Sequence, residues 1–204
     1  MPNWVSNIVR IEGEQDKVQA LVKQVSQPYT TNFPEHKYDE VAQSWVKVPN
    51  EQKQEACFSF WNIVSPTDLD AYYNEEERRA PIDASASEVM ETIRKNFAES
   101  NNWYNWNVRN WGTKWDSVEP KVLDEGDGFV VYQFETAWAP PTAAFIALSA
   151  QHPDLKIRVI FMEEFGWGGE GEFIGGQETI LHEWDDWDSM PDHIKDSSQV
   201  APIL

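Results

Sequence analysis

The chain is poor in cysteine and in long apolar segments. Cys57 is the only cysteine among 204 residues, so no internal disulfide and no zinc site built from several thiolates can form. No apolar run reaches the roughly 18 residues that a membrane-spanning helix needs. The first residues show neither a basic start nor a long apolar stretch, unlike a secretory signal. We therefore expect a cytoplasmic protein without a membrane partner.

Positive charge is also scarce. Lys and Arg number 16 against 35 Asp and Glu, which gives a formal net charge of −19. Such a chain repels phosphates, so we expect no direct binding of nucleic acid. The acidity is uneven, because residues 163–204 contain eleven acidic side chains and a single Lys. This excess predicts an acidic surface formed by the end of the chain.

Sequence motifs for catalysis and for metal binding are absent. There is no G-x-S-x-G nucleophile pattern, and the four histidines lack H-x-x-x-H spacing. Cys57 has no base beside it in the sequence and is predicted to be a buried, inert thiol. The glycines of 165–171 have acidic neighbours, which disfavours a phosphate cradle. We predict a non-enzymatic protein with no catalytic residue, metal or cofactor; a hydrolase or nuclease using scattered carboxylates and a divalent ion is the remaining enzymatic alternative.

Hydrophobic patterning predicts an α+β fold. Strands are expected at 4–11, 56–64, 121–123, 129–136, 156–163 and 177–184, and helices at 14–26, at 86–99 and after Pro140-Pro141. Little regular structure is expected at 27–55, a short helix at Glu75–Arg79, and a frayed tail at 185–204. The order predicts a ferredoxin-like split β-α-β antiparallel sheet with helices on one face. We expect a single domain, 1–204, with a helical, Trp-rich insertion at about 66–116, a C-terminal β-hairpin and an acidic extension at about 165–204.

Three tryptophan-containing segments are similar to motifs of a known family. They are MPNWVSN at the start, NWGTKWD at 110–116 and FETAWAPP at 134–141. In this order they resemble the YubB-like proteins of plasmids and phages, and the resemblance extends over about residues 2–165. It implies a ferredoxin-like domain and a mobile-element origin, with a bacterial host cell as the location. It implies no activity and no catalytic residues.

The densest group of aromatic residues lies at 101–116, with four Trp and one Tyr. These rings can cover the sheet beside Trp138, with Thr113 and Asp116 fixing a turn. Alternatively they form a cleft in which a nucleotide-like ring stacks. For that small-ligand function the candidate binding residues are Trp103, Trp106, Arg109, Trp111, Lys114 and Trp115.

The run from His182 to Asp188 is rich in acidic residues. Its spacing matches no metal-binding loop, and we expect a solvated acidic edge. The leading hypothesis is an interaction protein of a mobile element that inhibits a host nucleic-acid-binding defence protein by imitating phosphates. The partner would have a basic surface. The candidate partner-binding residues are Glu183, Trp184, Asp185, Asp186, Trp187 and Asp188.

Overall fold

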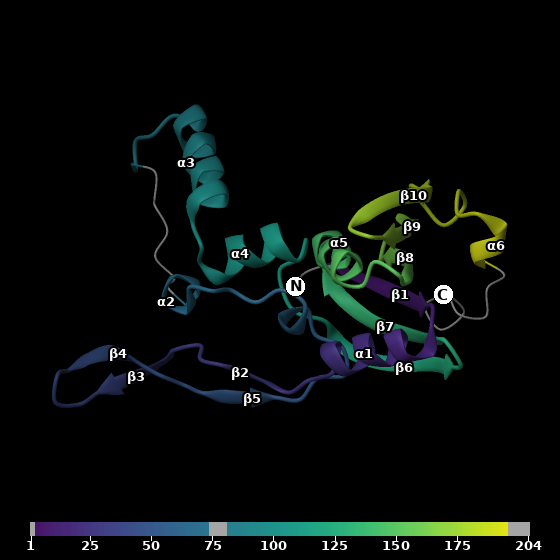
Figure 1. Ribbon diagram of the computed structural model, residues 1–204. Helices are drawn as coiled ribbons and strands as arrows, with labels where there is room; N and C mark the ends of the chain where they lie inside the picture. The colour runs from purple at the N-terminus through teal and green to yellow at the C-terminus, as the bar shows by residue number, and fades with distance from the viewer. Residues whose placement is uncertain (1–2, 74–80, 196–204) are drawn as a thin grey trace. The chain divides into compact units, whose positions relative to one another are not determined.

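The computed structural model describes residues 3–73 and 81–195 (Figure 1). The chain divides into two compact units. The first unit comprises 1–27, 56–65 and 108–204, and the second comprises 28–55 and 66–107. The expected insertion at about 66–116 overlaps the second unit, which also takes in 28–55. No helix in the described ranges is long and apolar enough to cross a bilayer.

The first unit is built on a six-stranded sheet with the order β10-β9-β8-β1-β7-β6. Its strands are β1 (Trp4–Glu12), β6 (Val118–Gly126), β7 (Phe129–Ala137), β8 (Lys156–Glu163), β9 (Gly168–Ile174) and β10 (Gln177–Trp184). All neighbouring strands are antiparallel. Helix α1 (Gln15–Val25) lies between β1 and β6 in the chain, and α5 (Thr142–Gln151) lies between β7 and β8. This is the split β-α-β arrangement, so the ferredoxin-like α+β prediction is confirmed, and β9-β10 is the expected C-terminal hairpin.

Helices α1 and α5 pack side by side on one face of this sheet. The amide nitrogen of Gln24 donates a hydrogen bond to Gln151 (2.7 Å), and its oxygen lies 2.8 Å from the ring of His152. Phe145 of α5 contacts the ring of Phe134 in β7, with 6.4 Å between centroids. We call this face of the sheet the covered face.

Residues 56–64 also pack on the covered face, and the prediction of a strand there was wrong. They contain a short 3-10 helix, η1 (Phe60–Asn62), whose first backbone N–H donates to the carboxylate of Asp116 (2.7 Å). Phe58 stacks on Phe134 with 5.1 Å between ring centroids. The apolar pattern of the segment reflects packing onto the sheet, whereas the second strand of the ferredoxin-like unit is β6.

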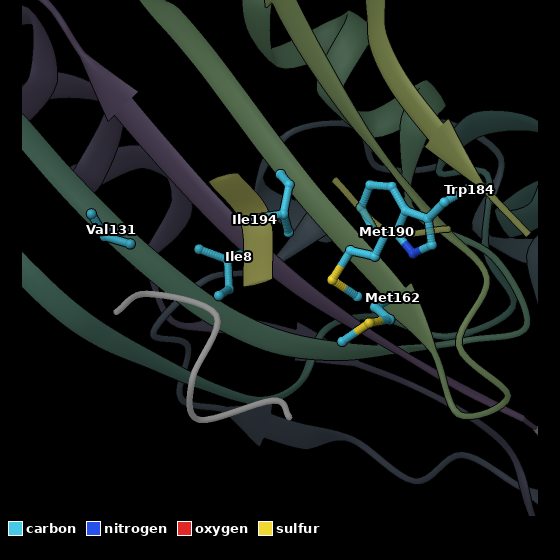
Figure 2. Packing of buried hydrophobic residues seen from close by; sticks show 6 residues of the cluster. All are labelled: Ile8, Val131, Met162, Trp184, Met190 and Ile194. Atoms are coloured by element: carbon cyan, nitrogen blue, oxygen red, sulfur yellow. The ribbon is translucent and has the colours of Figure 1, made fainter. Parts of the chain in front are cut away.

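The opposite face of the sheet is only partly covered. Ile8 and Val131 alternate with residues of the covered face and therefore point away from α5. They cluster with Met162, Trp184, Met190 and Ile194, as Figure 2 shows. Ile194 belongs to the short helix α6 (Asp192–Lys195). We call this side the open face.

The expected fraying of the tail was wrong for residues 185–195. Met190 and Ile194 are only 3% and 1% exposed, so this segment is anchored by apolar side chains. Residues 196–204, which also belong to the expected frayed tail, lie outside the described residues.

The second unit contains two antiparallel strand pairs, so the prediction of little regular structure at 27–55 was wrong. The pairs are β2 (Tyr29–Thr31) with β5 (Gln52–Gln54) and β3 (Glu35–Asp39) with β4 (Ser44–Val48). The unit's helices are α2 (Leu69–Tyr72), α3 (Ala86–Glu99) and most of α4 (Trp103–Asn110).

Helix α3 begins as predicted, with a capping box in which Ser85 and Glu88 bond to each other's backbone N–H groups. The short helix expected at Glu75–Arg79 lies outside the described residues.

Candidate functional site

A cleft of about 640 Å³ lies on the open face. Its lining comes from β1, β7 and β8, from the start of β6 and from the segments after β8 and β10. Its lining residues are Trp4, Ser6, Val118, Glu119, Gln133, Glu135, Met162, Glu163, Glu164 and Trp187. All of these belong to the first unit. We call this cavity the acidic cleft, because four carboxylates line it and no Lys, Arg or His is among these described residues.

Two residues that line the acidic cleft each leave a buried acceptor without a hydrogen-bond donor among the described residues. Gln133 points to the open face, whereas Glu163, at the end of β8, pairs with Val5 and lies on the other side of the sheet. Glu163 is 2% exposed; its Oε2 accepts from the backbone N–H of Phe165 (2.7 Å), but its Oε1 has no partner. Gln133, 7% exposed, likewise leaves its Oε1 without a donor. A buried acceptor left unpaired costs free energy, and an unpaired carboxylate costs more. The cleft is therefore suited to a ligand that brings both positive charge and N–H donors.

Two glycines near the acidic cleft allow tryptophan rings to pack against the backbone. Gly166 has φ +95°, and a Cβ there would lie 2.4 Å from the ring of Trp187. A Cβ at Gly168 would lie 2.6 Å from the ring of Trp184. The glycines of 165–171 thus allow indole rings to lie directly on the backbone, a use that the sequence analysis did not consider.

A second polar group on the open face surrounds Glu170, whose side chain is fully buried in β9. Its Oε1 accepts from Arg158 Nε (2.6 Å), and its Oε2 lies 2.8 Å from His182 Nδ1 and 3.3 Å from His193 Nε2. Burial opposes ionisation of the Glu170 carboxyl group, but hydrogen bonds from His182, His193 and Arg158 outweigh burial and lower its pKa. Glu170 is therefore an ionised carboxylate at neutral pH.

The Glu170 group borders a second cavity, of about 200 Å³. It is lined by Ile8, Arg10, Arg158, Ile160, Glu170, His193 and Ile194. The guanidinium of Arg10 pairs with Glu12 (2.9 Å) and lies 4.4 Å from the centroid of the Phe129 ring. This cavity, unlike the acidic cleft, has cationic side chains in its wall.

A match to a family model supports the fold. Residues 110–200 match the family model described as a ferredoxin-like domain in Api92-like protein. The chain is also similar to a crystal structure of the protein api92 from Yersinia pseudotuberculosis, with 10% identity and a TM-score of 0.47. That match covers 91% of this chain and 99% of the other. No match was found among curated proteins. These comparisons do not confirm the resemblance to YubB-like proteins.

The predicted partner-binding residues do not form one continuous surface. Asp185, Asp186, Trp187 and Asp188 are exposed in the loop after β10. Trp184, predicted to bind a partner, is only 5% exposed and packs within the cluster of Figure 2. Its apolar ring completes the small core beneath α6. Glu183 alternates with Trp184 along β10 and so points to the opposite side of the sheet.

The predicted small-ligand residues are divided between the two units. Trp103 and Trp106 belong to the second unit, where Trp106 contacts Tyr72 with 5.6 Å between ring centroids. Trp111 belongs to the first unit, is 2% exposed and donates from Nε1 to the carbonyl of Val64 (2.9 Å).

The remaining members of that set lie in the first unit. Lys114 Nζ lies between the rings of Trp115 and Trp138, at 4.6 and 4.7 Å from their centroids. Arg109 is half-buried near the end of α4. Thr113 donates to the carbonyl of Ala137 (2.8 Å), as expected of a residue that fixes a turn.

Several polar residues of the open face could not be recognised from the sequence. Glu163 and Gln133 lie within strands, and the sequence holds no signal that both residues line one cleft. Glu170 and His182 are cross-strand partners because of a register shift in the β9-β10 hairpin, which no residue pattern predicts. His193 reaches them only through the packing of α6, for which the sequence holds no signal.

Proposed function

We propose that this chain is a non-enzymatic interaction protein that binds a basic partner through the acidic cleft and the exposed loop 185–188. The observation that supports the proposal is a cleft lined by four glutamates and by no cationic side chain; one of these glutamates, Glu163, has a buried Oε1 without a donor. A partner that supplied a cation there would stabilise the carboxylate at the moment of binding. In the free protein, the unpaired carboxylate lowers the stability of the fold.

An arginine side chain fits the acidic cleft best. Its planar guanidinium offers several N–H donors, which suits the acceptors of Glu163 and Gln133. The rings of Trp4 and Trp187 line the same cleft and supply aromatic faces on which a guanidinium stacks. Asp185, Asp186 and Asp188 add exposed negative charge nearby in the chain, which would speed the encounter with a basic surface.

The class of partner follows from the same chemistry. Arginine-rich surfaces are typical of proteins that bind nucleic-acid phosphates. We therefore propose that the partner is a host nucleic-acid-binding defence protein and that carboxylates occupy the place of phosphates. The origin in a mobile element belongs to the same proposal and rests on the resemblance of the tryptophan motifs.

The first test uses a fluorescent nona-arginine peptide and the full chain. Glu163→Gln removes one charge from the cleft with little change of shape, and we expect its affinity for the peptide to fall at least about tenfold. Glu51→Gln removes the same charge from an exposed site in the second unit and should change affinity less than about twofold. Equal effects of the two substitutions would show that only overall charge matters and would contradict the cleft proposal.

A competition assay tests the imitation of phosphates. The wild-type chain should displace duplex DNA from the same peptide, and added salt should weaken the displacement. The Glu163→Gln variant should displace DNA less effectively than Glu51→Gln. Simultaneous binding of DNA and the chain to the peptide would contradict phosphate imitation while leaving cleft binding intact. The alternative function, binding of a nucleotide-like ring by the tryptophans of 103–115, stays a prediction.

A further inference from the structure

Three potential metal ligands converge on the open face from three separate elements. Glu170 comes from β9, His182 from β10 and His193 from α6. One ligand atom from each lies within 4.8 Å of the other two. The sequence separations of 12 and 11 residues match no local metal-binding motif, so only the fold brings these side chains together.

The distances within this group are close to those of a coordination shell. Ligand atoms at 2.0–2.1 Å from a tetrahedral zinc ion are about 3.3 Å apart. The Oε2 of Glu170 is 3.3 Å from His193 Nε2 and 2.8 Å from His182 Nδ1. Movement of the His182 ring by about half an ångström would bring its distance from Oε2 to the same value, and the two imidazole nitrogens already lie within 4.8 Å of each other. Both imidazoles are half-exposed, at 46% and 49%, so the rings have room to move and an ion can enter from solvent.

The surroundings of Glu170 also suit a metal ligand. Arg158 bonds to Oε1, the oxygen that does not face the histidines, and so fixes the orientation of the carboxylate. Hydrogen bonds of this kind position the ligands of known metal sites. The cavity of about 200 Å³ borders Glu170 and His193, which leaves space for water or an anion at a further coordination position.

We propose that Glu170, His182 and His193 bind one divalent transition-metal ion. The ligand set selects the class of metal, because imidazole nitrogen favours zinc, cobalt, nickel, copper or iron over calcium and magnesium. With three protein ligands the ion keeps an open position, and the guanidinium groups of Arg10 and Arg158 beside the cavity make an anion the expected fourth ligand. The site is separate from the acidic cleft and does not depend on the proposed function.

The test is a titration of the untagged full chain, first stripped with a chelator, with Zn²⁺ and with Co²⁺. Calorimetry should give one ion per chain with micromolar or tighter affinity, and bound Co²⁺ should show the visible absorption of a tetrahedral site. His182→Gln and His193→Gln should each weaken binding at least about tenfold. His36→Gln, which changes an exposed histidine in β3, should bind like the wild type.

A readout that needs no variant keeps the proposal testable if a substitution disturbs folding. In the NMR spectrum of the wild-type chain, Zn²⁺ should shift the ring resonances of His182 and His193 but not those of His36. Absence of one-to-one binding would overturn the proposal, as would unchanged affinity in folded His182→Gln and His193→Gln. A calcium affinity equal to the zinc affinity would also overturn it.

Discussion

The two faces of the six-stranded sheet differ in what their side chains contact. On the covered face, the rings of Phe58 and Phe145 pack on Phe134, and α1 and α5 exclude water. On the open face, a small cluster beneath α6 lies beside two cavities; four glutamates line one of them, and the buried carboxylate of Glu170 borders the other. Apolar packing stabilises a fold, whereas buried charges cost stability and are retained where they bind something. We therefore propose that the covered face provides stability and that the open face provides binding.

The largest effect is expected on the covered face. Phe134→Ala should lower the free energy of unfolding by about 3–5 kcal/mol, because it leaves a cavity among several aromatic rings. Urea denaturation followed by circular dichroism measures this loss. A loss below about 1 kcal/mol would show that this face does not provide the main core.

A smaller loss is expected for the apolar cluster of the open face. Ile194→Ala should cost about 1–2 kcal/mol, because a four-residue helix can detach locally without unfolding the sheet. Because α6 carries His193, the same variant should also bind Zn²⁺ more weakly than the wild type. A loss of stability as large as that of Phe134→Ala would contradict the claim that the covered face contributes more to stability than the open face.

A substitution in the acidic cleft should increase the free energy of unfolding, whereas those in the two apolar clusters should decrease it. Glu163→Gln should raise the free energy of unfolding by up to about 1 kcal/mol, because it removes a buried charge that has no cation beside it. Thermal and urea denaturation at neutral pH provide the measurement. Clear destabilisation would mean that the carboxylate contributes to the fold and is not held ready for a ligand.

The smallest effect concerns Cys57, in the segment that packs on the covered face. Burial raises the pKa of its thiol, although a backbone hydrogen bond at Val122 acts in the other direction. The reactive thiolate is therefore rarer than in free cysteine, and alkylation at about pH 8 should be several-fold slower. A rate equal to that of free cysteine would indicate an exposed thiol and would contradict the predicted inert thiol.

The ferredoxin-like order could be predicted because α1 and most strands have clear hydrophobic patterns and because Pro140-Pro141 marks the start of the apolar helix α5. The prediction failed at 56–64, because a segment that lies on a sheet buries the same apolar residues as a strand within it. Only the bonds to Asp116, 50 or more residues away in the chain, distinguish the two cases.

The candidate sites were harder to predict, and the hairpin β9-β10 shows why. The turn at Gly175 and Gly176 pairs Ile174 with Gln177. A regular ladder would then pair Glu170 with Leu181. The register shift between Ile180 and His182 instead places His182 opposite Glu170. No residue pattern predicts this shift, so the two metal-ligand candidates could not be joined from sequence.

The most direct test of binding at the open face is methionine-methyl NMR of the full chain during titration with the nona-arginine peptide. Met162 lines the acidic cleft, whereas Met90 lies in α3 of the second unit. We predict that the Met162 methyl resonance shifts with saturation and that the Met90 resonance does not. A bound peptide that leaves Met162 unchanged, or that shifts Met90 instead, would contradict the assignment of binding to the open face.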